Sequence, residues 1–144
     1  MLLSSSTKSA LSCYADAVIA SVGPESLTSE HTFLNLQAVF PRNLVIAALD
    51  LIDHENVLTC KGLALGQYQV LGSTSTYHVF LDIPGPTSTY CTCPAFAYLV
   101  LSSETYLMCK HVLAARLAHR MGRCIERPVD TDQLSQMITQ EYNY

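Results

Sequence analysis

Charged side chains are scarce in this chain: Asp, Glu, Lys and Arg make up only 14% of its 144 residues, against about a quarter in an average globular protein. Apolar residues make up 49% of the sequence, so one domain of this length can bury a core of its own. A surface so poor in charge is typical of a subunit that packs against another protein. The net charge of −4 does not favour a free nucleic-acid-binding protein.

Long apolar runs are missing as well. No segment approaches the roughly 18 to 20 uninterrupted apolar residues that cross a bilayer, so we expect no membrane association. Lys8 is the only early charge, and Asp16 interrupts the apolar stretch that follows, a pattern that does not fit a signal peptide. We therefore expect a reducing compartment, cytosolic or nuclear. There Cys13, Cys60 and Cys124 should be free thiols in core or half-buried positions.

The sequence carries no phosphate-binding loop. Gly62 and Gly66 lack both the spacing and the lysine of a P-loop, so ATP-driven work would have to come from another protein. Aromatic and basic residues are not interleaved either. This argues against a protein that binds single-stranded nucleic acid by itself.

Two pairs of potential metal ligands are present: Cys91-Thr-Cys93 and Cys109-Lys-His111. Zn²⁺ prefers four nitrogen or sulfur ligands in a tetrahedron, and a Cys₃His set fills all four positions, as in structural zinc sites. In an extended strand, residues two apart project from the same face, so Cys91 and Cys93 could both face one ion. The sequence therefore predicts one structural zinc ion.

The second pair, Cys109 and His111, needs a different backbone conformation from the first. Residues two apart on a helix point about 200° away from each other, so Cys109 should precede a helix and His111 should lie in its first turn. Proline is favoured at the first helical position, and Pro94 therefore makes Cys93 the predicted N-cap of a short helix that reaches Leu101. Buried core cysteines are the alternative interpretation, but the paired spacing favours zinc.

A catalytic zinc site is the other functional interpretation of this cluster. Glu104 is the one acidic residue between the two ligand pairs, and the only candidate for a general base. A filled four-ligand sphere leaves no open position for water. We therefore expect a protein that is not an enzyme, with a zinc-dependent hydrolase as the less favoured alternative.

Hydrophobic periodicity predicts an α+β fold in one compact domain. Residues 1–53 should form an N-terminal helical segment, with helices over residues 11–22, 30–40 and 43–53. The first should bury one face: Leu11, Tyr14, Ala15, Val18 and Val22. The third is apolar on nearly all sides except at Asp50 and Asp53, so it should be the buried one. Residues 54–124 should form an antiparallel β meander and a zinc module that ends in a helix over residues 110–123. The short β-rich runs of the meander are residues 57–63, 67–72 and 77–83. Residues 125–144 should form a C-terminal helical tail, with a last helix over residues 130–142.

A basic stripe is predicted on the helix after the second ligand pair. Half of the chain's eight Lys and Arg residues recur there at i, i+4, i+7 and i+11: Arg116, Arg120, Arg123 and Arg127. This stripe could contact DNA phosphates or an acidic protein partner. It could equally be a solvated face, with Glu126 pairing with Arg123. Pro128 would end the helix and could leave Arg127 off the stripe.

The residues also resemble a known family. The run Cys91-x-Cys93-Pro94-Ala95-Phe96, followed by Cys109-Lys110-His111-x-Leu113-Ala114, resembles the SWIM zinc finger, a C-x-C…C-x-H module. The upstream segment Tyr68-Gln-Val-Leu-Gly-Ser73 and the short tail resemble the stand-alone SWIM proteins of the Shu complex in homologous recombination.

This resemblance implies more than the residues alone. Cys91, Cys93, Cys109 and His111 match the ligand motif of the family one by one, and no family position implies a catalytic residue. Similar proteins pair with a RecA-fold recombinase paralog in the nucleus. The pair promotes assembly and persistence of recombinase filaments on single-stranded DNA, which this subunit would contact indirectly. The resemblance thus implies a non-catalytic adaptor in DNA repair, with an autonomous nucleic-acid-binding zinc module as the alternative.

Overall fold

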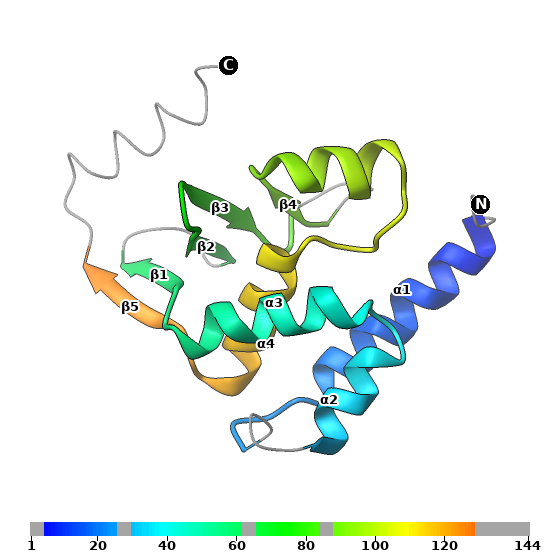
Figure 1. Ribbon diagram of the computed structural model, residues 1–144, viewed down its shortest axis with the longest axis horizontal. Helices are drawn as coiled ribbons and strands as arrows, with labels where there is room; N and C mark the ends of the chain where they lie inside the picture. The colour runs from blue at the N-terminus through cyan, green and yellow to red at the C-terminus, as the bar shows by residue number, and fades with distance from the viewer. Residues whose placement is uncertain (1–4, 26–29, 62–65, 84–87, 129–144) are drawn as a thin grey trace.

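The computed structural model describes residues 5–25, 30–61, 66–83 and 88–128. Three helices come first: α1 (Ser5–Ala20), α2 (Glu30–Gln37) and α3 (Arg42–Asp53). The strands β1 (Val57–Lys61), β2 (Gln67–Leu71), β3 (Thr76–Phe80) and β4 (Tyr90–Cys91) follow. The helix η2 (Phe96–Ser102), helix α4 (Lys110–Met121) and strand β5 (Ile125–Pro128) complete the described chain (Figure 1). The predicted α+β class is confirmed.

One five-stranded sheet has the order β4-β3-β2-β1-β5. The pairs β1–β2, β2–β3 and β3–β4 are antiparallel, as the predicted meander requires. Strand β5 pairs with β1 in parallel, with Ile125 opposite Leu58. The sheet is therefore mixed. Ile125–Pro128 is a strand rather than the beginning of a helical tail, and the helix predicted over residues 130–142 lies outside the described residues.

Helix α4 ends at Met121, two residues before the predicted end. Gly122 adopts the left-handed conformation with φ 67°, which a glycine reaches without strain, and its N–H bonds back to carbonyl oxygens of the last helical turn. The chain then turns away from the helix axis toward the edge of the sheet. The arginines after Gly122 therefore do not continue the face of α4.

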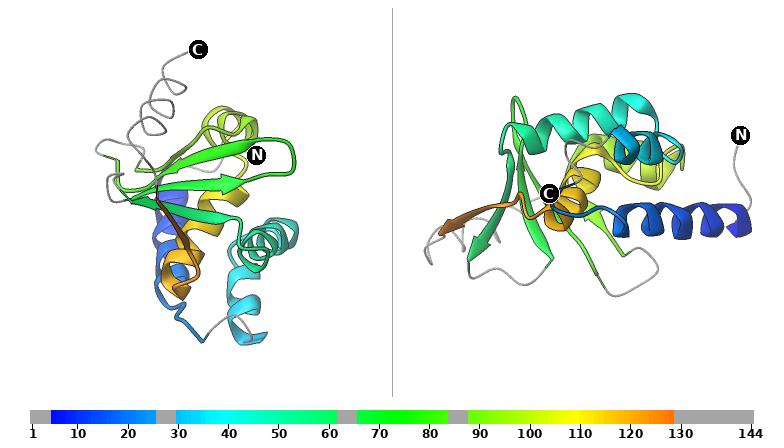
Figure 2. Two further views of the ribbon diagram at one scale, coloured as in Figure 1. Left: turned by 90° about the vertical axis from the view of Figure 1, so that its left-hand side faces the viewer. Right: turned by 90° about the horizontal axis from the view of Figure 1, so that it is seen from below.

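The core centres on α4. This helix packs against α1 and α3 and against strands β1 to β4, and it buries residues on nearly all of its sides. Leu113 and Leu117 of α4, Ile52 of α3, Leu36 of α2 and Phe96 of η2 are all completely buried. The two views of Figure 2 show α4 running beneath the sheet with α3 beside it. Cys109, which precedes this helix, and His111, in its first turn, are consequently held in the interior.

Helix α1 packs against the rest of the molecule mainly through its C-terminal half. Ala15 and Val18 are buried, as predicted, and so is Ile19, but Leu11 and Tyr14 of the predicted face are 36% and 54% exposed. Figure 2 shows the reason: the N-terminal part of α1 extends past the other helices. Leu11 and Tyr14 were therefore predicted wrongly as core residues, because the helix is longer than the surface that covers it.

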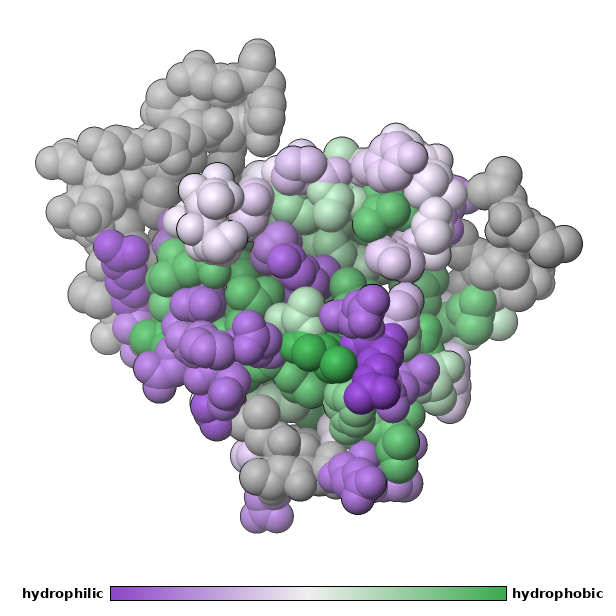
Figure 3. Space-filling view, in the orientation of Figure 1, coloured by the Kyte–Doolittle hydropathy of each residue, from purple (hydrophilic) through white to green (hydrophobic). Residues whose placement is uncertain are grey.

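Several large apolar side chains are exposed on the remaining surface. Leu34, Ile46, Tyr98 and Leu101 are also exposed, so α3, predicted to be buried on almost every side, has one apolar residue in solvent. In Figure 3 hydrophobic areas lie between the hydrophilic ones across the face that carries α3. Within the described ranges no helix has the length and apolar character needed to span a bilayer.

The thiols outside the metal cluster differ in exposure. Cys13 is exposed, which corrects the prediction of a core or half-buried position, because it lies on the protruding half of α1. Cys124 is half-buried, as predicted, and both residues are free thiols. The side chain of Cys60 lies outside what the structure describes.

Candidate metal centre

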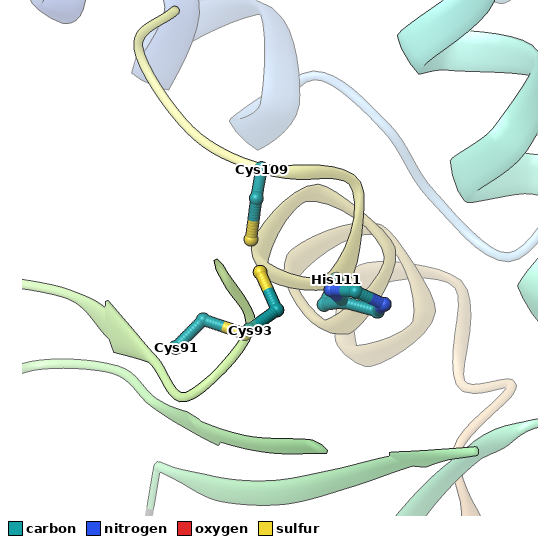
Figure 4. Close-up of side chains that lie close together, drawn as sticks. All are labelled: Cys91, Cys93, Cys109 and His111. Carbon is teal, nitrogen blue, oxygen red and sulfur yellow. The ribbon is translucent and has the colours of Figure 1, made fainter. Parts of the chain in front are cut away.

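The structure brings both predicted ligand pairs together. The sulfur atoms of Cys91, Cys93 and Cys109 and a ring nitrogen of His111 all lie within 4.8 Å of one another, and all four side chains are buried. Figure 4 shows Cys91 reaching the cluster from the end of β4, Cys93 from the loop after it, and Cys109 and His111 from the start of α4. The fold thus joins two pairs that are well separated in the sequence, as a shared ion requires.

The first pair is positioned by a strand end and a helix start. Cys91 is the last residue of β4 and lies opposite Val79 of β3. Pro94 begins a helical turn that continues as η2, and Cys93 Sγ accepts a hydrogen bond from the backbone N–H of Phe96 at 3.3 Å. Cys93 therefore acts as the cap of this turn, as predicted. The η2 helix is of the wide π type, which is rare and often occurs at functional sites.

The second pair is positioned by the N-terminus of α4. Cys109 is the N-cap residue, with extended backbone angles, and its Sγ accepts a hydrogen bond from the N–H of Val112 at 3.5 Å. His111 is the second residue of the helix, in its first turn. The positive end of the helix dipole and these N–H groups stabilise negative charge on sulfur. The backbone N–H groups of Phe96 and Val112 therefore act to lower the pKa of the two cysteines that they contact, Cys93 and Cys109.

An ion fits this donor set. The Nδ1 atom of His111 is buried and has no hydrogen-bond partner within the described part of the chain. A buried polar atom left without a partner is unfavourable, and coordination to a cation satisfies it. Three thiolates and one imidazole are the ligands of closed, tetrahedral structural zinc sites. The cluster therefore suits one Zn²⁺ ion.

The pKa values of the thiols show how strongly the cluster concentrates charge. Hydrogen bonds from Cys109, and then from Cys91, hold the pKa of Cys93 far below that of an ordinary thiol. The pKa of Cys91 is raised, chiefly because its hydrogen bonds to Cys109 and Cys93 retain the proton, and further by burial. Cys93 is thus favoured as a thiolate, while the neighbouring thiol of Cys91 keeps its proton. A bound cation removes this competition, because it stabilises all the thiolates at once.

The four arginines do not form one stripe, so the predicted helical arrangement is wrong: Arg116 and Arg120 lie on α4, Arg123 follows its C-cap and Arg127 lies in β5. Arg116 Nη2 lies 2.9 Å from a carboxylate oxygen of Asp16 in α1. Arg120 donates hydrogen bonds to the carbonyl oxygens of Val22 and Ala20. Two of the four arginines thus attach α1 to α4. Contact of these four arginines with DNA or a protein partner stays a prediction.

Glu104 is an exposed residue that lines a different groove from the one beside the cluster. Its groove, of about 330 Å³, runs along the corner between α2 and α3 and includes Leu11 and Phe40. A second groove, of about 640 Å³, is lined by Cys93 and His111 and does not include Glu104. The acid that the sequence offers as a general base therefore faces away from the groove beside the metal ligands.

Sequence reasoning missed two tyrosines that support this region. The ring of Tyr77 lies against that of His111, with centroids 4.5 Å apart. Tyr68 is buried, and its hydroxyl forms a 3.0 Å hydrogen bond with Nδ1 of His119 on α4. Both tyrosines face α4 across the sheet. Strand periodicity could have placed Tyr68 on the inward face beside Val70, but no local signal indicates which helical residue either tyrosine meets.

Comparison with known proteins defines the class first. Residues 77–119 match the SWIM zinc finger, and this segment contains all four residues of the cluster. The chain is therefore a SWIM zinc-finger protein with a zinc site. No solved structure matches the chain.

Full-length relatives define the family more narrowly. The chain is 33% identical over 123 residues to mouse "Zinc finger SWIM domain-containing protein 7", covering 85% of this chain and 78% of that protein. It is 32% identical over 123 residues to the human protein of the same name, covering 85% of this chain and 84% of that protein. The zebrafish protein is 35% identical over 98 residues, with 67% and 66% covered. The chain belongs to the family of zinc finger SWIM domain-containing protein 7.

Proposed function

We propose that this protein is a non-catalytic, zinc-stabilised adaptor subunit. Together with a RecA-fold recombinase paralog, it promotes assembly or stability of recombinase filaments on single-stranded DNA in nuclear homologous-recombination repair. The supporting observation is the closed metal centre in a chain of this family: four buried ligands that join the end of β4 to the start of α4. A site of this kind fixes structure and offers no open coordination position to a substrate.

The surface supports a role in assembly. Large apolar side chains are exposed on helices α1, α2, α3 and η2, while the chain as a whole has few charges. Protein interfaces are depleted in charge at their centres and enriched in aromatic residues. An ATPase function would come from the partner, because the sequence lacks a phosphate-binding loop.

Co-purification tests the proposal directly. The tagged, zinc-loaded chain is recovered from a nuclear extract, and its partners are identified by mass spectrometry. A RecA-fold ATPase should be recovered in stoichiometric amount. The purified pair should then extend the lifetime of recombinase filaments on single-stranded DNA. Recovery of the chain alone, together with hydrolytic turnover of a substrate that depends on its zinc, would contradict the adaptor role.

Charge reversal separates an adaptor from a direct DNA-binding module. Arg116 and Arg120 are poor positions for this test, because they hold α1 and their loss disturbs the fold. Arg123 and Arg127 lie beyond the end of α4, so Arg123→Glu with Arg127→Glu is the informative variant. The adaptor function predicts negligible DNA affinity for the isolated chain, before and after the change. A DNA site predicts salt-dependent binding whose slope falls by roughly 0.7 for each single-strand phosphate that the variant no longer neutralises.

A further inference from the structure

One aromatic ring contacts the histidine of the metal centre. Tyr77 of β3 is half-buried, and its ring centroid lies 4.5 Å from that of His111, with the two planes inclined at 38°. Ring pairs at this distance contribute about 0.5 to 1.5 kcal/mol beyond the burial of their area. His111 itself is 3% exposed, and its Nδ1 has no hydrogen-bond partner within the described residues. Packing against the ring of Tyr77 therefore restrains the orientation of the imidazole.

The turn between β2 and β3 holds the tyrosine from the other side. A Cβ atom added to Gly72 would lie 2.9 Å from Cε2 of Tyr77 and 2.9 Å from the carbonyl oxygen of Ser75. The Gly72 N–H donates to that same carbonyl oxygen at 2.8 Å, which closes the turn. Gly72, Tyr77 and His111 thus lie one against the next. A side chain at Gly72 would push the ring of Tyr77.

The same ring borders the opening beside the metal ligands. The groove of about 640 Å³ is lined by Tyr77, His111 and Cys93, together with Pro94, Ala95 and Lys110. Both ligands on this groove are nevertheless almost completely buried, at 3% exposure each. The ring of Tyr77 contributes the cover on the strand side, because it lies directly against the imidazole.

We propose that Tyr77 is a positioning residue for the metal centre, held in place by Gly72. Its ring keeps the imidazole of His111 in the orientation that presents a ring nitrogen to the three thiolates, and it restricts access from the groove to the Cys93 and His111 side of the site. Ligating histidines are commonly oriented by a hydrogen bond from the second ring nitrogen. Here the aromatic contact of Tyr77 also restrains the ring. This inference is independent of the adaptor role.

The rate of zinc loss tests this proposal on the full chain. Zinc-loaded protein is mixed with excess chromophoric chelator, and the transfer rate is followed by absorbance. Tyr77→Leu removes the ring but keeps an apolar side chain, and it should release zinc roughly threefold to tenfold faster, as expected when one aromatic ring pair is removed. Tyr77→Phe keeps the ring and should release zinc within about twofold of the wild-type rate. Tyr98→Leu, at a 68% exposed tyrosine between the same ligand pairs, is the matched control and should change nothing.

A spectroscopic measurement distinguishes positioning from general destabilisation. In the Co²⁺-substituted protein, Tyr77→Leu should shift the visible absorption bands, because the imidazole is free to rotate, while Tyr77→Phe should reproduce the wild-type spectrum. Wild-type release and spectrum for Tyr77→Leu would overturn the proposal. So would a Tyr77→Phe variant that behaves like Tyr77→Leu.

Gly72→Ala provides a second route if Tyr77→Leu does not fold. The added methyl group displaces the ring without removing it, so zinc release should again be faster than in the wild type. Release at the wild-type rate from a folded Gly72→Ala protein, with an unchanged Co²⁺ spectrum, would contradict the proposal.

Discussion

Arg120 Nη2 donates a hydrogen bond to the carbonyl oxygen of Ala20 at 2.6 Å, which joins α4 to the end of α1. Its Nε donates to the carbonyl oxygen of Val22 at 3.1 Å. Carbonyl groups at a helix C-terminus have no partner within the helix, so a guanidinium group that binds two carbonyls at that end stabilises it. Arg120 therefore caps α1 from another part of the chain.

Loss of this cap should weaken the docking of α1. Arg120→Ala should lower the free energy of unfolding by about 1 kcal/mol, since the two charge-assisted hydrogen bonds are partly exposed. Arg120→Lys should recover part of that loss, because one ammonium group cannot reproduce the planar fork. Urea denaturation measures both changes. Arg42→Ala, at an exposed arginine of α3, is the control and should stay within about 0.5 kcal/mol of the wild type. An Arg120→Ala protein as stable as that control would contradict the capping role.

Zinc should be required for folding. Purified protein should contain one zinc ion per chain by elemental analysis, and Cys109→Ser or His111→Ala should be poorly soluble and readily cleaved by proteases. Metal binding at a structural site contributes about 10 to 16 kcal/mol in zinc-finger peptides, more than the stability of a small domain. Cys13→Ser changes an exposed thiol outside the cluster and should fold and bind zinc normally. Well-folded protein without metal would refute the site.

The thiols should differ in reactivity. In native, zinc-loaded protein, alkylation should modify Cys13 first, because it is exposed, and Cys124 slowly, because burial raises the pKa of its thiol to about 11. Cys91, Cys93 and Cys109 should remain unmodified until a chelator is added. Mass spectrometry of peptides resolves the order of labelling. If the chelator leaves the labelling pattern unchanged, the three cysteines do not hold a metal ion.

Two histidines should titrate in opposite directions from the usual value of 6.5. The pKa of His54 is raised by the carbonyl oxygen of Asp50 and then by the Asp50 carboxylate, whereas burial lowers the pKa of His78. His54 therefore stabilises the fold below pH 6.5, and this contribution is lost as the pH rises through its folded pKa. His78 opposes folding as the pH falls below 6.5, because the folded state resists its protonation.

Histidine ring NMR signals recorded across the pH range measure both values in zinc-loaded protein. His54→Gln removes the upper titration and assigns it. Equal midpoints, or a His78 midpoint above that of His54, would contradict the environments described for these two residues.

The metal centre was predictable because its determinants are local. Each ligand pair is separated by one residue, and Pro94 identifies the helix start that Cys93 caps. Cys109 precedes its helix for a steric reason that holds in any fold, since residues two apart on a helix cannot share an ion. The support from Tyr77 could not be predicted, because it depends on how β3 and α4 meet.

The prediction of one arginine stripe was wrong for a reason that is visible in the sequence. Helical spacing was extended from Arg120 to Arg127 across Gly122, a residue that commonly ends helices, and in the structure Gly122 does end α4. No comparable pattern in the sequence indicates strand β5. Glu126, Arg127 and Pro128 have low β propensity, and their strand exists because β1 offers an unpaired edge. The division of the chain into three segments stays a prediction.

The parallel pairing of β5 with β1 has a consequence for synthesis on the ribosome. Strands β2 to β4, both ligand pairs and α4 all leave the ribosome before Ile125–Pro128, whose partner strand β1 is made before any of them. Contacts between residues so distant along the chain form slowly, because a long loop must close first. The nascent chain can therefore capture its metal while one edge of β1 is still open, and β5 then pairs at the edge of the sheet opposite β4, the strand that carries Cys91.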